Sequence, residues 1–114
     1  ANNRLKSTQL ISDINMKMAD IMMSYEGRYH KMPTQTITSA GKKVVFRPVN
    51  GRVEAYIEKI NENICLSLLT AGWQNVDQFR VVKQTGSSVI DRAQASKAGT
   101  TVCQNVKDFT IIFK

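Results

Sequence analysis

The chain has 114 residues, of which 42% are hydrophobic and 22% are charged, and its formal net charge is +7. This length predicts a single domain, residues 1–114, and no apolar run approaches the roughly 18 residues that a membrane-spanning helix requires. The 16 basic residues are scattered, and only Lys42 and Lys43 are adjacent, which favours a solvated basic surface over a nucleic-acid-binding module.

The segment from Leu10 to Tyr25 has an unbroken helical period. Its apolar residues recur every three or four positions, at Ile11, Ile14, Met18, Ile21 and Tyr25. No Gly or Pro lies between Asn2 and Glu26, and Gly27 supplies a stop signal. Residues 1–26 are therefore predicted to form a spine helix of roughly 35 Å, and we expect this helix to continue upstream of Ala1.

Residues 27–51 are predicted to form a connecting loop followed by a strand. The loop is expected from Arg28 to Lys42, which contains Pro33, Gly41 and several Ser and Thr residues. It carries His30, which has no nucleophile to pair with and is predicted to be a surface residue. Lys43 to Val49 has strand composition, and Asn50-Gly51 is a turn signal.

Residues 52–114 are predicted to form helices and a sheet. Helical spacing returns at Arg52 and runs through Val53, Ile57, Ile60, Ile64 and Leu68. Because Asn61 is a good N-cap, we expect either two short helices or one helix broken near Asn61, with the second piece running from Glu62 to Ala71. Trp73 follows Gly72 and is predicted to fill the core.

The end of the chain has the composition of strands. Phe79 to Lys83 is rich in β-formers, Gln84 to Gly99 is a polar excursion, and Thr100 to Gln104 again has strand composition. Phe109, Ile111 and Phe113 alternate with their neighbours, which predicts a half-buried closing strand. One long helix followed by strands and shorter helices indicates an α+β fold. We expect Ile14, Met18 and Ile21 to face this sheet, near Phe109, Ile111 and Phe113.

The sequence carries no recognisable catalytic or ligand-binding constellation. It has no Gly-rich phosphate loop and no Ser or Cys with a plausible base, and Asp77, Asp91 and Asp108 are spread over predicted loops. We therefore expect no enzyme, no catalytic residues, no metal and no cofactor. The five methionines are predicted to fill gaps in the core or to form a helix-packing face, rather than a soft binding surface: Met16, Met18, Met22, Met23 and Met32.

Cys65 and Cys103 are the only cysteines, and neither has a second Cys at metal-ligand spacing. A zinc site would lack ligands, because the single His30 is distant from both cysteines in the sequence. Two alternatives remain open from the residues themselves. They are a pair of reduced, buried thiols, or one disulfide formed in an oxidising compartment.

The C-terminal half of the chain resembles the type IVb pilins. The resemblance lies in Ile60-Asn-Glu-Asn-Ile-Cys-Leu-Ser-Leu-Leu, Trp73-Gln-Asn-Val, Phe79-Arg-Val-Val, Val102-Cys103 and Phe109-Thr-Ile-Ile-Phe, and it covers roughly Asn50 to Lys114. It implies a pilin-like fold, in which a long N-terminal helix packs on an antiparallel sheet. It also implies a disulfide between Cys65 and Cys103 that bounds a C-terminal region. The strongly apolar N-terminal segment of that family is not part of this sequence and is expected upstream.

The same resemblance implies a structural subunit, major or minor, of a type IVb pilus on the bacterial cell surface, with a role in adhesion, aggregation or secretion. Before assembly the subunit would reside in the periplasm, anchored in the inner membrane by the upstream segment. Its partners would be other pilin subunits, the assembly machinery and a host surface or other pili, with no nucleic acid expected. Two alternatives stay open: a pseudopilin of a type II secretion system, or a periplasmic or surface module that binds an anionic ligand through Arg28 to Lys43 or Gln84 to Lys97.

Overall fold

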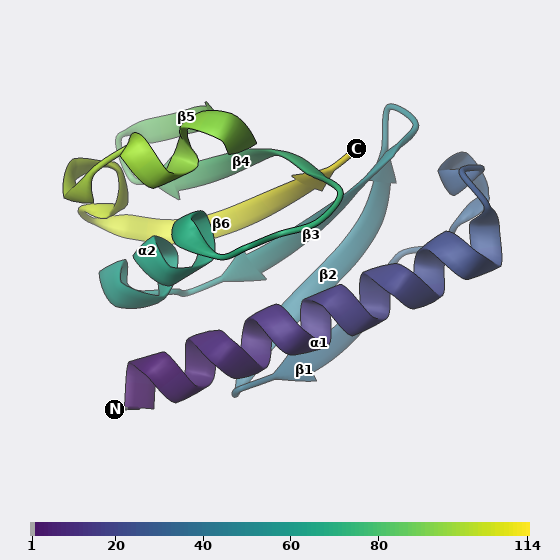
Figure 1. Cartoon of the computed structure of the whole chain (residues 1–114), viewed down its shortest axis with the longest axis horizontal. Coiled ribbons are helices and arrows are strands. Elements are labelled where there is room, and N and C mark those ends of the chain that lie inside the picture. Colours follow the sequence, from purple (N-terminus) through teal and green to yellow (C-terminus); the bar gives the residue numbers. More distant parts are fainter. Residues whose placement is uncertain (1) are drawn as a thin grey trace.

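The computed structural model describes the backbone of residues 2–114 and the side chains of residues 4–114. It is an α+β domain in which two helices lie on one face of a six-stranded antiparallel sheet (Figure 1). The helices are α1 (Asn2–Tyr25) and α2 (Glu62–Thr70), and three 3-10 helices are η1 (Tyr29–Lys31), η2 (Arg92–Lys97) and η3 (Thr100–Cys103). The strands are β1 (Gln35–Ser39), β2 (Lys42–Val49), β3 (Arg52–Glu58), β4 (Val76–Lys83), β5 (Gly86–Asp91) and β6 (Val106–Phe113).

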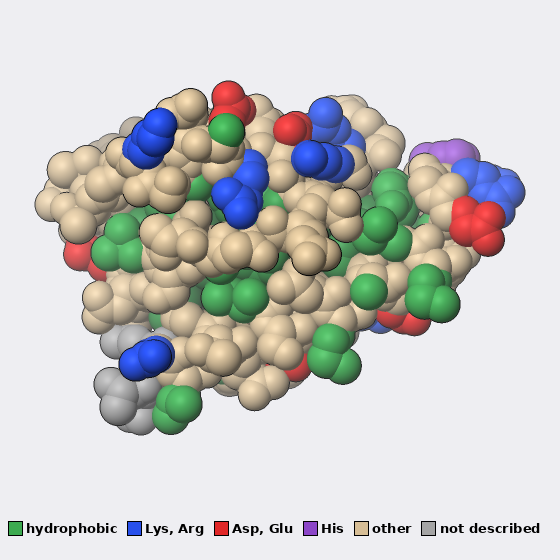
Figure 2. All heavy atoms as spheres, in the orientation of Figure 1, with side chains coloured by type: hydrophobic (Ala, Val, Ile, Leu, Met, Phe, Trp, Pro, Cys, Tyr) green, Lys and Arg blue, Asp and Glu red, His purple; other side chains and the backbone are tan. Residues whose placement is uncertain are grey.

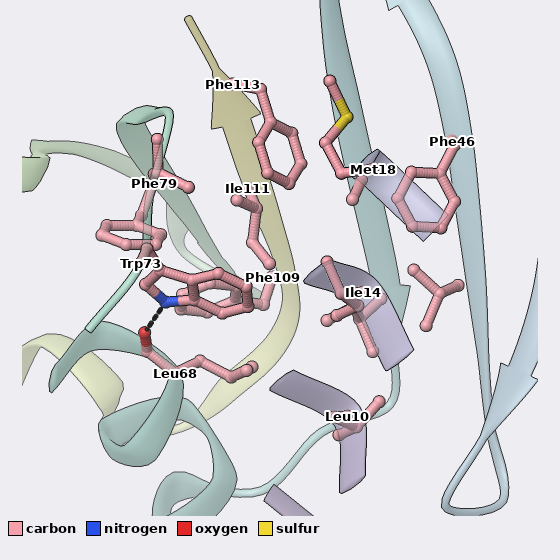
Figure 3. Close-up of a cluster of buried hydrophobic side chains, with 14 of the residues drawn as sticks. Leu10, Ile14, Met18, Phe46, Leu68, Trp73, Phe79, Phe109, Ile111 and Phe113 are labelled. Atoms are coloured by element: carbon pink, nitrogen blue, oxygen red, sulfur yellow. Dashed lines mark hydrogen bonds between the residues drawn. The ribbon is translucent and has the colours of Figure 1, made fainter. Parts of the chain in front are cut away.

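The predicted spine helix is confirmed as α1. Its inward stripe consists of Leu10, Ile14, Met18 and Ile21, each at most 3% exposed. The helix ends where the sequence predicted. Glu26 and Gly27 have positive φ values of 48° and 85°, and an α-helix cannot continue through residues in this conformation. Figure 3 shows Leu10, Ile14 and Met18 pointing into the same cluster as Phe46, Ile111 and Phe113. The prediction that α1 packs on the sheet is therefore confirmed.

The strand order β1-β2-β3-β6-β4-β5 places the last strand of the chain in the middle of the sheet. The predicted closing strand is confirmed as β6, but the prediction that it is half-buried is wrong, because every residue from Phe109 to Phe113 is at most 6% exposed. Phe109, Ile111 and Phe113 face the helices. Thr110 and Ile112 lie on the other face, where side chains of β3 and β4 flank them from both sides, for instance Tyr56 and Arg80 opposite Thr110. A strand with neighbours on both edges is thus covered even on the face that carries no helix.

The predicted helix at Arg52 is wrong, since this segment is β3. Val53 and Ile57 are four residues apart, a spacing that fits one side of a helix and also one face of a strand. Ala55 lies between them and is also fully buried, which completes the two-residue period of a strand. The Asn50-Gly51 turn then folds β3 back onto β2 and adds the ladder of hydrogen bonds that decides between the two structures.

In three other segments the secondary structure differs from the prediction. The predicted loop from Arg28 to Lys42 contains the edge strand β1, whose sequence Gln-Thr-Ile-Thr-Ser has only one large apolar residue. The predicted strand from Thr100 to Gln104 is mostly the 3-10 helix η3, and the polar excursion from Gln84 to Gly99 contains β5 and η2. Strands at an edge bury few side chains, so the sequence pattern that identifies them is weak.

The second helix and the core tryptophan are confirmed. Asn61 caps α2, with its side-chain oxygen accepting a hydrogen bond of 2.9 Å from the backbone N–H of Ile64. The indole Nε1–H of Trp73 donates to the carbonyl of Leu68 at 2.6 Å (Figure 3). Because Trp73 is only 5% exposed, this bond satisfies the one polar atom that its ring brings into the core.

Two hairpin turns have the backbone of a type I′ turn, but only one has the residues that this turn prefers. Asn50 and Gly51 have φ values of 51° and 80°, and Ala40 and Gly41 have 52° and 75°. Because Asn tolerates positive φ better than Ala, Ala40→Asn should raise the free energy of unfolding by about 1 kcal/mol. Urea denaturation checks this, with Asn50→Ala as the reciprocal variant that should lower stability by a similar amount.

Candidate functional site

Helix α1 carries a second apolar stripe, which faces solvent. Leu5, Met16 and Met23 are 70%, 69% and 80% exposed, and exposed Ala19 lies on the same line. At about 3.6 residues per turn, these four positions point to the side of α1 opposite the buried stripe. We call Leu5, Met16, Ala19 and Met23 the outer stripe. Figure 2 shows hydrophobic side chains projecting along the lower edge of the molecule, where α1 lies.

The outer stripe is attached to a rigid support, because α1 is bonded to the sheet as well as packed on it. The Ser39 hydroxyl, 3% exposed, donates to one carboxylate oxygen of Asp13 at 2.6 Å, and the Gln9 amide donates to the other at 2.9 Å. These two hydrogen bonds lower the pKa of Asp13 below its ordinary value, and the bond from Ser39 has the larger effect. The orientation of α1 is thereby fixed against the end of β1.

A groove of about 320 Å³ opens beside the outer stripe, between α1 and the segment that joins α2 to β4. Its walls are made of amide and apolar side chains, and no charged residue lines it: Asn15, Met18, Ala19, Met22, Gly72, Gln74, Asn75 and Phe113. Asn75 is held at φ 60°, and its carbonyl accepts a 2.8 Å bond from the N–H of Lys114. The groove is suited to an uncharged group, such as an apolar or amide side chain from another molecule.

The two cysteines that the sequence singled out are joined in a disulfide. The Cα atoms of Cys65 and Cys103 are 5.8 Å apart, and both residues are fully buried. The bond ties α2 to η3 and closes a loop with a sequence separation of 38. Hydrogen bonds brace the same corner, from the Lys83 ammonium to the Thr101 carbonyl at 2.9 Å and from the Asn105 N–H to the Glu62 carboxylate at 3.3 Å. The disulfide alternative left open by the sequence is the one that the structure adopts.

The three aspartates that the sequence singled out are engaged in separate structural contacts. Asp77 pairs with Arg52, and Asp91 accepts a bond from Gln78. Asp108 accepts a bond from the backbone N–H of Lys59. Burial of the nearby Tyr56, together with its hydrogen bond to Asp108, raises the pKa of Tyr56 to about 12.

The described part of the chain assembles no metal-ligand set and no long apolar helix. Among residues 2–114 no three His, Cys, Asp or Glu side chains come together as a group that could hold a metal ion. Within that same range, no helix is both long enough and apolar enough to pass through a membrane. His30 lies exposed on η1, and the two cysteines are buried between α2 and η3.

The outer stripe is not predicted from the sequence, because all five methionines are assigned the same role in the core or in helix packing. Met18 and Met32 are buried, at 3% and 4% exposure, which fits the predicted role in the core. Met16 and Met23 face solvent, and Met22 is 37% exposed beside the groove. The available signal was the spacing of Met16 and Met23, seven residues apart and therefore on one side of the helix.

No protein-family model, curated protein or solved structure matches this chain. The fold and the surface therefore define a class by their own features. It is an α+β domain in which one long helix has apolar side chains on two opposite sides, and in which a buried disulfide secures the C-terminal half.

Proposed function

We propose that this chain is the globular domain of a structural subunit, major or minor, of a type IVb pilus, and that it assembles into a filament on the bacterial cell surface. The single observation that carries the proposal is the outer stripe of α1. A helix that is apolar on two opposite sides is expected to be covered on both in its working state. The sheet covers one side of α1, and neighbouring subunits would cover the other.

Other features of the domain support this proposal. The C-terminal half has the Cys positions and the Phe-Thr-Ile-Ile-Phe strand that resemble type IVb pilins, and the two cysteines form a disulfide. A disulfide of this kind is typical of proteins that fold in the periplasm or outside the cell. An apolar helix segment upstream of α1 would hold the subunit in the inner membrane before assembly and would then lie inside the filament.

Two alternatives remain. A pseudopilin of a type II secretion system would use the outer stripe in the same way but would act in secretion. A surface ligand-binding module is favoured by the amide-lined groove beside Met22, which is the right size for a small uncharged group. This groove contains no residue of Arg28 to Lys43 or Gln84 to Lys97, the segments through which the sequence predicted an anionic ligand to bind. In that case the groove, and not the outer stripe, would be the essential surface.

The experiment that tests the proposal uses the full-length gene in its host. Deletion should abolish or shorten surface filaments, or block a secretion step, and the intact gene should restore the lost property. A gene carrying Met16→Glu and Met23→Glu should fail to restore it, because two carboxylates cannot be buried between subunits without a large desolvation cost. Electron microscopy of the cell surface and a secretion assay provide the measurements.

A matched control separates assembly from folding. Ser24→Glu with Ser88→Glu places the same charge on exposed positions outside the outer stripe, one on another side of α1 and one on β5, and this gene should restore filaments or secretion. Both double variants should unfold at the same temperature as the parent domain. Full restoration by the Met16 and Met23 variant would overturn the assembly role of the outer stripe, and a deletion strain with normal filaments and secretion would favour the binding module.

A further inference from the structure

The antiparallel topology gathers lysines at one end of the sheet. β2 begins, β3 ends, β6 begins and β4 ends at this same end, as the pairs Val44 with Ile57, Glu58 with Asp108 and Lys83 with Val106 establish. Each of these strand ends carries at least one lysine, either within the strand or directly beside it: Lys42, Lys43, Lys59, Lys83 and Lys107. Residues that are scattered in the sequence are therefore neighbours at one edge of the fold.

The N-terminal turns of α1 lie at the same end. The bond between Ser39 and Asp13 places the middle of α1 beside the end of β1, which is where β2 begins. Arg4 and Lys6 precede Asp13 by several residues, so at about 1.5 Å per residue they lie roughly 10 to 14 Å farther along the helix. Figure 1 shows the first turns of α1 at this end, on the side of α2 and the start of β6. We call the seven residues the basic end: Arg4, Lys6, Lys42, Lys43, Lys59, Lys83 and Lys107.

The charge of the basic end is only partly compensated. The ion pairs found among the described side chains are Lys17 with Asp20, Arg52 with Asp77 and Arg80 with Glu54, so none of them uses a residue of the basic end. The ammonium groups of Lys42 and Lys83 donate to backbone carbonyls, which leaves their charge in place. Four carboxylates lie at this end, against seven cations. Asp108 is only 8% exposed, Glu62 accepts a bond from a backbone N–H, Asp13 accepts bonds from Ser39 and Gln9, and Glu58 is half-buried at the end of β3.

An exposed leucine lies beside two residues of the basic end. Leu5 is 70% exposed, and it stands between Arg4 and Lys6 in the first turns of α1. An apolar side chain flanked by cations is the arrangement that inserts at the boundary between lipid headgroups and acyl chains. Lysine and arginine stems can lie along the same boundary while their charged ends stay among the phosphates.

We propose that the basic end docks on an anionic phospholipid membrane surface, with Leu5 inserted beside Arg4 and Lys6. The basic end would face the inner membrane in the proposed pilin precursor, so the proposal deepens the proposed function and rests on it for its cellular setting. Docking would hold the globular domain with its basic end against the membrane from which subunits are extracted. A nucleic acid is the less suitable occupant, because the aromatic side chains of residues 4–114 are all buried or half-buried, which leaves none fully exposed to stack on bases.

The test is sedimentation of the 114-residue chain with vesicles at 100 mM salt. The chain should bind vesicles that contain 30% phosphatidylglycerol and should not bind vesicles of phosphatidylcholine alone. Each basic residue close to an anionic surface strengthens binding by about fivefold, so Lys6→Gln, Lys43→Gln and Lys107→Gln together should weaken binding by about 100-fold. Leu5→Ser should weaken it by about tenfold, whereas Met23→Ser, at the far end of α1, should have little effect.

The control has the same net charge. Arg28→Gln, Lys31→Gln and Arg47→Gln remove three cations away from the basic end of a molecule 36 Å long. Since charges are screened over about 10 Å at this salt concentration, the control should bind within about threefold of the parent chain. Equal losses in the two triple variants would overturn the proposal, because net charge alone would then explain binding. The membrane-docking proposal would also be overturned if the chain did not bind vesicles, or if it bound duplex DNA in place of vesicles. In either case the filament experiment would still decide the proposed function independently.

Discussion

Loss of the disulfide between Cys65 and Cys103 is expected to lower the free energy of unfolding by about 4 kcal/mol. The bond closes a loop with a sequence separation of 38, and its removal restores the conformational freedom of that loop in the unfolded chain. Such a loss is a large part of the total stability of a domain of this size. Urea denaturation of the Cys65→Ala and Cys103→Ala double variant and of the parent chain measures the difference. A variant is used in place of chemical reduction because the parent disulfide is buried and slow to reduce in the native state.

Two observations accompany this measurement. The mass of the unreduced parent chain should lack two hydrogens relative to the reduced chain, and adding a reductant should not change the denaturation curve of the double variant. Native parent protein whose two thiols alkylate readily before reduction would contradict the disulfide. It would also weaken the proposed pilin relationship, which depends on the same two residues.

Truncation of the buried stripe of α1 is expected to have the second large effect. Ile14 and Ile21 are at most 1% exposed, and they pack toward the sheet from the middle of the domain. Ile14→Ala and Ile21→Ala should each lower the free energy of unfolding by about 2 to 5 kcal/mol, through lost burial and the cavity left behind. Chemical denaturation monitored by Trp73 fluorescence gives the values, because Trp73 belongs to the same core.

The matched control is Asn15→Ala on the exposed side of the same helix. Asn15 lines the groove and is not part of the core, so its replacement should change the stability by less than about 0.5 kcal/mol. If Ile14→Ala and Asn15→Ala had equal, small effects, α1 would not dock on the sheet in solution. Together with the outer-stripe variants, this series separates the side of α1 that folds the domain from the side that we propose assembles it.

The sequence by itself determined the elements whose signals are local. The three- and four-residue period of α1, its stop at Gly27, the Asn61 cap of α2 and the Asn50-Gly51 turn each depend on a few consecutive residues, and all four are present in the structure. The α+β class also followed from the order of these elements. The pairing of the two cysteines did not, because the residues alone left reduced thiols as an alternative.

Tertiary structure decided the features that depend on which neighbour a segment meets. Val53 and Ile57 fit both a helix and a strand until pairing with β2 and β6 selected the strand. β6 is buried on both faces because β3 and β4 flank it, and this position in the sheet cannot be read from its alternating residues. Likewise, the outer stripe and the basic end exist only because the sheet covers one side of α1 and antiparallel pairing brings distant lysines to one edge.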